Sequence, residues 1–106
     1  YGYAQAMLQQ IANHIGQLPN RITITGHTDS VPAKGPNGYS NWELSSDRAN
    51  SARRVLRASG IPENRFSAVR GKAATDPLLP DQPDRAENRR ITILLVREAP
   101  VVPPQL

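Results

Sequence analysis

The chain has 106 residues, of which 38% are hydrophobic, enough for one small domain with one core. Its 13 Lys and Arg against 9 Asp and Glu give a net charge of +4, which suits nucleic acid or an anionic surface as a partner. The absence of cysteine excludes a disulfide framework and a thiolate metal site, and it fits a reducing compartment or a periplasm equally well. Because no long apolar run and no export leader occurs, the sequence predicts no membrane span.

Three elements are predicted in the first 40 residues. Apolar residues recur at helical spacing from Ala4 to Leu18, which predicts an amphipathic helix that ends before Pro19-Asn20. The segment RITITGH, residues 21–27, alternates isoleucine with arginine and threonine, which is typical of a strand with one buried face. Residues 30–40 contain two prolines and two glycines and predict an irregular loop, a frequent place for binding function.

A second helix is predicted between Ser40 and Gly60. Ser40 followed by Glu43 forms a capping box, in which each side chain bonds a free backbone N–H at the helix start. Gly60 suits the left-handed position that follows a helix. Strands are predicted over 65–70 and 89–96, and three prolines between them predict an irregular segment with a short helical turn over 85–88.

This order of elements predicts an α/β (α+β) sandwich with helices covering one face of a small sheet. Three strands make a thin sheet and the chain opens on a helix, so a further strand is expected before Tyr1. The proline-rich segment 98–106 is predicted to be a disordered tail, and residues 1–97 are predicted to form the domain.

One charged side chain falls on the apolar face of the second helix. On a helical wheel at about 100° per residue, Arg48 lies within the arc of Leu44, Ala49, Ala52, Val55 and Leu56. A guanidinium held against a core needs a partner, because leaving such a charge unpaired costs roughly 3 to 5 kcal/mol. Asp29 ends the strand that this helix must cover, so Asp29 and Arg48 are predicted to lie close together.

Two interpretations of this pair stay open. It is either a buried salt bridge that joins loop to helix, or a site where Asp29 binds an ammonium and Arg48 binds a carboxylate, the two charges of an amino-acid head group. Asn41 is either part of the helix start or a donor to the same ligand. Strand alternation sends Arg89 and Arg90 to opposite faces, so one of them is expected to reach the site.

Other features favour structural roles. His27, Asp29 and Ser30 are spaced for a catalytic dyad or a metal site, but further ligands at metal spacing are missing, so His27 is predicted to hydrogen-bond loop backbone. Trp42 is interpreted as a core or staple residue rather than a binding platform. Acidic residues interrupt the arginines of the second helix, and no series of exposed aromatic residues is available to stack bases, which disfavours nucleic acid.

Four segments together resemble the OmpA-like peptidoglycan-binding family. They are GHTD at 26–29, NWELSSDRAN at 41–50, GIPENRFSAVRGKAATDP at 60–77 and NRRITILLV at 88–96. This long, dispersed pattern is far more specific than a short motif. The wording GYSNWELSSDRAN and the long 30–40 loop resemble the flagellar stator members of the family, since porin and lipoprotein members usually have a shorter loop.

The resemblance implies non-catalytic binding of the diaminopimelate in the peptidoglycan stem peptide, without a cofactor or a metal. It implies that Asp29 and Arg48 hold the diaminopimelate. It places four more residues on the same pocket: Thr28, Asn41, Leu44 and Arg89. It also implies an OmpA-like fold, a mixed sheet with helices on one face, whose first strand and one wall of the site lie outside this chain.

For a stator protein, the resemblance implies a homodimer in the periplasm of a Gram-negative bacterium. A helix outside this chain would anchor the protein in the inner membrane, beside a membrane-embedded, MotA-like stator partner. The function would be mechanical, to fix an ion-driven stator to the cell wall. The alternative within the family is the anchor domain of an outer-membrane porin or a peptidoglycan-associated lipoprotein. A wall hydrolase such as an amidase is a third class, which turnover would reveal.

Overall fold

A computed structural model describes residues 2–96, with side chains from Gln5 onward. The helices and strands are α1 (Gly2–Ile15), β1 (Arg21–His27), α2 (Asn41–Ala58), β2 (Phe66–Gly71) and β3 (Arg90–Val96). Short 3₁₀ helices, Glu63–Arg65 and Ala86–Asn88, precede β2 and β3. The predicted tail, 98–106, lies outside the described residues.

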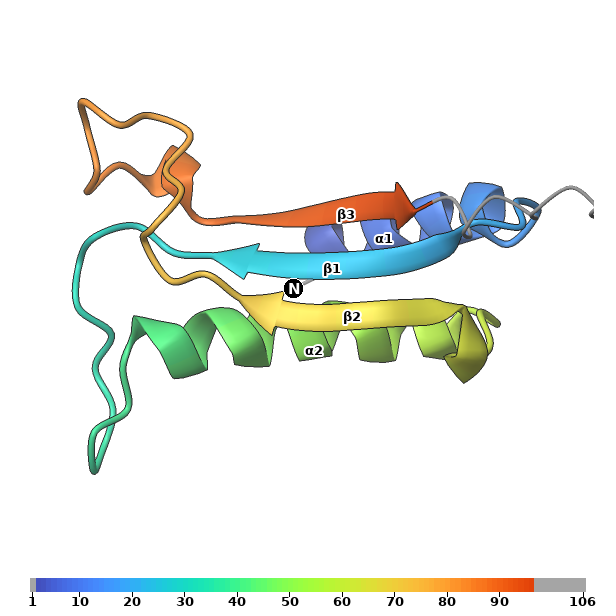
Figure 1. Ribbon diagram of the computed structural model, residues 1–106, viewed down its shortest axis with the longest axis horizontal. Coiled ribbons are helices and arrows are strands. Elements are labelled where there is room, and N and C mark those ends of the chain that lie inside the picture. Colours follow the sequence, from blue (N-terminus) through green and yellow to red (C-terminus); the bar gives the residue numbers. More distant parts are fainter. Residues whose placement is uncertain (1, 97–106) are drawn as a thin grey trace, which may run out of the picture.

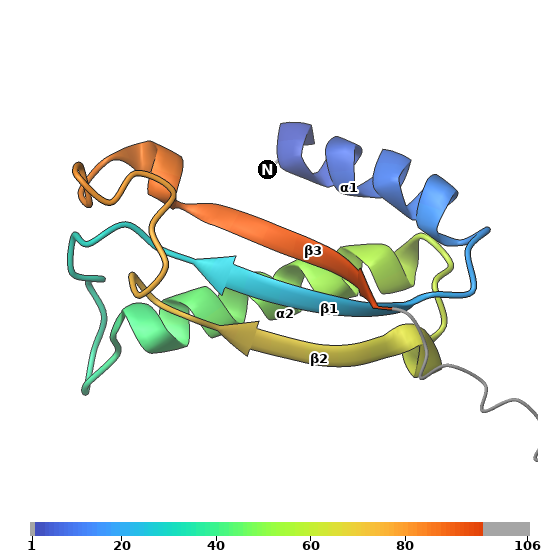
Figure 2. The same cartoon turned by 45° about the horizontal axis from the view of Figure 1, so that its top comes forward.

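The three strands form one sheet in the order β2-β1-β3. β1 pairs with β2 in parallel and with β3 in antiparallel, so the sheet is mixed. Both helices lie on the same face of the sheet, with α2 packed against β1 and β2 and α1 packed against α2 (Figure 1, Figure 2). The predicted α+β fold, with helices on one face of a small sheet, is confirmed.

The hydrophobic core lies between the sheet and the helices. Its centre is Ile22 and Ile24 of β1, which pack with Ala49 and Leu56 of α2 and Ile15 of α1. Full burial of a side chain the size of isoleucine contributes roughly 1.5 to 3 kcal/mol. The alternating pattern of β1 therefore faces α2 with its isoleucines, as its sequence predicts.

The opposite face of β1 is buried as well, which the alternating pattern does not predict. Thr23, Thr25 and His27 are all buried, although neither helix of residues 2–96 covers this face. β1 is the central strand, so long side chains from its neighbours lie over it. Arg70 of β2, for example, donates from Nε to Oγ1 of Thr25 at 3.4 Å.

The ends of α2 follow the predicted signals. Ser40 Oγ accepts a hydrogen bond from the Trp42 N–H at 3.2 Å, and Glu43 Oε1 accepts one from the Ser40 N–H at 2.7 Å. These contacts belong to the predicted capping box. Gly60 has φ +106°, the left-handed conformation that closes the helix.

The first helix ends three residues earlier than predicted. Beyond Ile15 the chain turns more tightly, with hydrogen bonds from the Gln17 N–H to the His14 carbonyl and from the Leu18 N–H to the Ile15 carbonyl. Leu18 therefore lies exposed instead of on the apolar face. Neither α1 nor α2 has the length and apolar character that crossing a membrane requires, in the part of the chain that the structure describes.

A pair of glycines brings α2 close to the sheet. Gly26 of β1 and Gly71 of β2 are neighbours in the parallel register. A Cβ on Gly26 would overlap the backbone carbonyl of Ser45, and a Cβ on Gly71 would overlap the Ser45 side chain and the Ser46 N–H group. Only glycine therefore lets the first half of α2 lie this close to the ends of β1 and β2.

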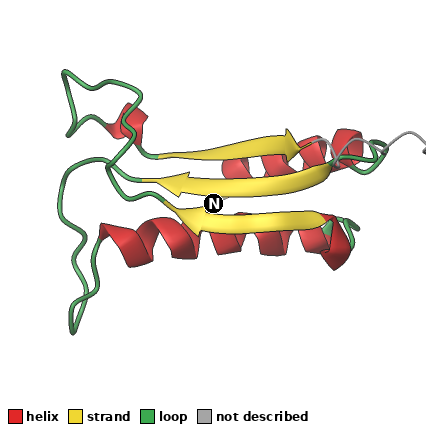
Figure 3. Ribbon diagram, in the orientation of Figure 1, coloured by secondary structure: helices red, strands yellow, loops and turns green. Residues whose placement is uncertain are grey.

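The two long irregular segments leave the sheet at the same end. Residues 28–40 follow β1, and most of residues 72–89 form a loop between β2 and β3 (Figure 3). The N-terminal end of α2 lies at this end too, and its first turns extend beyond the strands (Figure 1, Figure 2). The predicted site residues are thus carried by elements that meet at one end of the sheet.

Candidate functional site

The Asp29 carboxylate is held in a fixed orientation just beyond β1. Thr28 donates its N–H to the Ala73 carbonyl at 2.9 Å and its Oγ1 proton to the Asp29 carbonyl at 2.8 Å. Asp29 Oδ1 accepts the Val31 N–H at 3.1 Å. Because Thr28 is itself fully buried, it acts by positioning Asp29.

Asp29 forms an ion pair with Arg89. Arg89 Nε lies 3.4 Å from Asp29 Oδ2, and the two side chains are 50% and 12% exposed. The antiparallel register places Arg90 opposite His27, so the residue before Arg90 lies beside the residues that follow His27. Of the two neighbouring arginines, Arg89 is therefore the one whose side chain pairs with Asp29.

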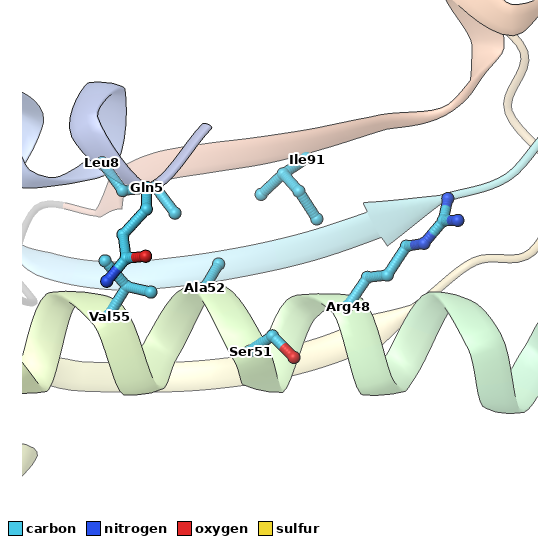
Figure 4. A pocket seen from close by; sticks show the side chains of 7 residues that line it. All are labelled: Gln5, Leu8, Arg48, Ser51, Ala52, Val55 and Ile91. Atoms are coloured by element: carbon cyan, nitrogen blue, oxygen red, sulfur yellow. The ribbon is translucent and has the colours of Figure 1, made fainter. Parts of the chain in front are cut away.

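Of the two interpretations of the Asp29 and Arg48 pair, the salt bridge is not present among the side chains that the structure describes. Arg48 is exposed, and no ion pair of its guanidinium occurs among the described side chains. A long arginine stem can cover apolar surface while its charged end stays in water, so its place on the apolar arc does not require a carboxylate partner. In Figure 4 the side chain extends from α2 toward the end of β1.

A cavity of about 370 Å³ lies beside Arg48, between α1, α2 and β3. Its lining consists of Gln5, Leu8, Arg48, Ser51, Ala52, Val55 and Ile91 (Figure 4). Arg48 is the one charged side chain in this lining. Small-molecule pockets commonly measure about 300 to 1,000 Å³ and are largely apolar with a few polar groups. This cavity suits a ligand with an aliphatic stem and an anionic end.

Asn41 ties the loop after β1 to the start of α2. Its Nδ2 group donates to the carbonyls of Asp29 at 3.3 Å and Val31 at 3.1 Å. Its Oδ1 atom is buried and has no hydrogen-bond partner among the described residues. Leu44 is half-buried one turn further along and does not line the cavity beside Arg48.

Asn88 is a positioning residue that sequence reasoning missed. It is fully buried, its Oδ1 accepts the Leu79 N–H at 2.7 Å, and its Nδ2 donates to the Gln82 carbonyl at 2.9 Å. These bonds fold the proline-containing loop directly before Arg89. An asparagine at the end of an irregular loop was the available signal, because such a side chain commonly satisfies loop backbone.

His27 has a structural role, but not with the predicted partner. Its Nε2 lies 3.1 Å from Thr92 Oγ1 on β3, and its Nδ1 is buried without a partner among the described residues. Burial, followed by the nearby positive charge of Arg90, lowers the pKa of His27 below its usual value of 6.5. Within the described side chains, no three His, Asp or Glu residues come together in a way that could hold a metal ion.

Trp42 is not a core residue. The residue is 54% exposed, because the first turn of α2 extends beyond the ends of β1 and β2 (Figure 1, Figure 2). The interpretation of Trp42 as part of the core is therefore wrong.

Comparisons with known proteins identify the family. A family model described as the OmpA family matches residues 3–90. Motility protein B of Escherichia coli K12 is 46% identical over 97 residues, which are 91% of this chain and 32% of that protein. The crystal structure of the periplasmic domain of Helicobacter pylori MotB gives a TM-score of 0.79 at 27% identity, over 92% of this chain and 64% of that one.

A further similar structure is the cell wall anchor of the T6SS from Pseudomonas aeruginosa. Its TM-score is 0.75 at 32% identity, and the match covers 89% of this chain and 66% of that one. This chain spans only 32% of the length of the Escherichia coli motility protein. The family model, by contrast, covers well over half of this chain. The chain therefore belongs to the OmpA family.

Proposed function

We propose that this chain is the peptidoglycan-binding domain of a flagellar stator protein of the MotB kind, and that it binds the cell wall without catalysing a reaction. Three findings support this proposal: the OmpA family match, the 46% identity to motility protein B, and the similarity to a cell wall anchor. The identity to motility protein B favours a stator over the alternative, an anchor domain of an outer-membrane porin or lipoprotein.

The proposed ligand is the diaminopimelate of the stem peptide. The end of its side chain carries an ammonium and a carboxylate on one carbon. Arg48 binds the carboxylate, for which a planar guanidinium offers two parallel N–H donors. Asp29 binds the ammonium. The observation that carries this proposal is that Arg48 lies exposed on a cavity wall, with no ion pair among the described side chains.

The remaining predicted residues support this pair. Arg89 lies against one oxygen of Asp29 and keeps half of its own side chain exposed, so it adds positive charge for the ligand carboxylate. Thr28 and Asn41 orient the backbone around Asp29. Leu44 is proposed to line the pocket when ligand is bound, on the helix that carries Arg48.

In the full-length protein we propose a mechanical role. The domain lies in the periplasm, belongs to a homodimer that is anchored in the inner membrane, and fixes a MotA-like partner to the wall so that torque acts against a rigid load. The periplasmic origin of the similar Helicobacter pylori MotB domain supports this location.

Sedimentation with purified sacculi tests the proposed clamp. We expect Arg48→Ala and Asp29→Asn each to weaken binding by roughly ten- to a hundredfold, because each removes a charge-assisted contact. The matched control is Arg54→Ala, an exposed arginine on the same helix that bonds Ser51 and lies outside the cavity. Wild-type binding by both folded site variants would refute the clamp. Release of dye from labelled sacculi by this domain would overturn the non-catalytic assignment.

A further inference from the structure

The net charge of the molecule is concentrated at the end of the sheet that lies away from the candidate site. At this end α2 stops and β1 and β2 begin, whereas Asp29 lies beyond the other end of β1 (Figure 1). Among residues 2–96, this arginine end carries one acid, Glu63, and five arginines: Arg21, Arg53, Arg54, Arg57 and Arg65. Its net charge is +4, the same as that of the whole chain. Over the other described residues, seven Lys and Arg balance seven Asp and Glu.

Side-chain contacts join the elements of the arginine end. Arg65 donates from Nε to the Asn20 carbonyl at 2.8 Å and from Nη2 to the Ile15 carbonyl at 3.1 Å. These bonds hold the end of α1 and the start of β1 beside the start of β2. The guanidinium of Arg65 is thus used within the fold, and the other four arginines decide how this end meets a partner.

Only one carboxylate faces those four arginines within the described part of the chain. Glu63 Oε2 lies 3.3 Å from Arg53 Nη1 and 2.9 Å from Arg57 Nε, so one negative charge is shared by two guanidinium groups. Arg21 and Arg54 are exposed, and neither makes an ion pair within residues 2–96. Positive charge therefore remains in excess on the surface.

Helix geometry accounts for only part of this excess. Both helices end at the arginine end, and a helix C-terminus attracts basic side chains because it carries roughly half of a negative charge. Arg57, in the last turn of α2, lies at such a position. Two helix ends together supply roughly one negative charge. Most of the charge of +4 is thus left for a partner.

An exposed apolar residue lies at the same end. Leu18, in the turn between α1 and β1, is 41% exposed and precedes Arg21 by three residues. Arginines beside an exposed leucine suit a membrane surface, where the charges meet lipid phosphates and the apolar side chain enters the headgroup layer. An acidic polypeptide would match the charges but would not use the leucine. None of these residues lines either cavity, so a broad surface fits this end better than a small ligand.

The arginine end and the candidate site act as separate surfaces. The length of β1 lies between them, about 20 Å at about 3.3 Å per residue, whereas charges in physiological salt are screened beyond about 8 Å. We propose that the arginine end binds a membrane surface that contains anionic phospholipids, with its guanidinium groups on the phosphates and Leu18 in the headgroup layer. The presence of a membrane nearby rests on the proposed function.

Flotation with lipid vesicles tests this proposal. The chain is mixed with vesicles of phosphatidylcholine, with or without phosphatidylglycerol, and the bound fraction is measured. One double variant, Arg21→Gln with Arg54→Gln, removes two exposed charges from the arginine end. The matched control, Lys34→Gln with Arg85→Gln, removes two exposed charges from the loops at the other end. The two variants have the same net charge, and circular dichroism checks that both are folded.

We expect the wild type to bind the vesicles with phosphatidylglycerol and not those of phosphatidylcholine alone. A basic residue at an anionic surface contributes roughly fivefold in affinity, so the Arg21 and Arg54 double variant should bind roughly twentyfold less tightly. The control should lose about twofold at most, because its charges lie beyond the screening length. Leu18→Ser should weaken binding to vesicles and leave binding to soluble polyglutamate unchanged, since a polypeptide offers no apolar layer.

Three results would overturn the inference: no binding of the wild type to the anionic vesicles, whether or not it binds polyglutamate; equal vesicle binding by the two double variants; or normal vesicle binding by Leu18→Ser. Sedimentation with sacculi separates this inference from the proposed function. The Arg21 and Arg54 double variant should sediment with sacculi as the wild type does. A wild type that floats with vesicles but does not sediment with sacculi would refute wall binding and leave the membrane-binding surface in place.

Discussion

His27 is the last residue of the central strand, and the residue as a whole is 3% exposed. Burial disfavours its charged form most, and the positive charge of Arg90 across the strand pair acts in the same direction. The negative charge of Asp76 opposes these two effects, and Lys72 adds a smaller lowering. The pKa of His27 is therefore lowered, and the neutral imidazole is the form that the folded protein prefers.

This preference makes the stability of the fold depend on pH. Above pH 6.5 His27 is neutral in both the folded and the unfolded chain. As pH falls below that value, the unfolded chain binds a proton first, so the free energy of unfolding decreases until the folded pKa is passed. We expect His27→Gln to remove this part of the pH dependence in urea unfolding measured across pH 6.5.

The other histidine provides the control for this experiment. His14 is exposed on α1, so His14→Gln should leave the slope of stability against pH as it is in the wild type. An unchanged slope in His27→Gln would show that the proton is taken up elsewhere.

At the scale of single residues, local chemistry was predictable and side-chain partners were not. The end of the GHTD motif identified Asp29 as a polar group of special interest, and the structure holds its carboxylate in a fixed orientation. Which arginine pairs with it could not be derived, because the approach of Arg89 depends on β3 lying beside β1, and strand order is not visible in a single sequence. The guanidinium of Arg48 reaches solvent because its aliphatic stem is long. A helical wheel gives the direction of a side chain but not its length.

Among the elements, α2 does the most to position the site. It carries Asn41, Trp42 and Arg48, and it rests on the glycine pair of β1 and β2. Because a methyl group on Gly26 would meet backbone rather than a flexible side chain, the helix itself has to move to make room for it.

We therefore expect Gly26→Ala to lower the free energy of unfolding by about 1 to 3 kcal/mol. Displacement of α2 should also weaken binding to sacculi. The comparison variant is Ser67→Ala, at an exposed position on β2, which should change stability by less than about 0.5 kcal/mol. Urea unfolding followed by circular dichroism measures both, and equal midpoints for Gly26→Ala and wild type would contradict the close packing.

The boundaries of the helices and strands could be predicted from the sequence where short-range signals mark them. The limits of α2 were predictable because a capping box and a left-handed glycine act within a few residues of each helix end. β1 was predicted over the same residues as observed, since its alternation is regular. The exposure of Trp42 was not predictable, because it depends on how far α2 extends beyond a sheet built from distant segments.

For the whole molecule, the described fold is one sheet and two helices that share one core. The proline-rich segment 98–106 is predicted to contribute no stability to it. We expect a chain that ends at residue 97 to unfold with a free energy within about 0.5 kcal/mol of the full chain. Ending the chain at residue 89 should abolish cooperative unfolding, because it removes β3 from the centre strand. A large loss of unfolding free energy in the chain that ends at residue 97 would contradict this prediction, because it would mean that the tail stabilises the domain.

The central position of β1 has a mechanical consequence for the proposed role in anchoring to the wall. Asp29 follows β1 by two residues, so a pull on a ligand bound there passes through the chain into this strand. Residues 21–27 are paired with β3 along their whole length and with β2 along most of it. A pull directed along β1 therefore loads the perpendicular bonds to β3 and the slanted bonds to β2 together in shear, instead of opening them one after another. A small domain can thereby withstand sustained tension at its binding end.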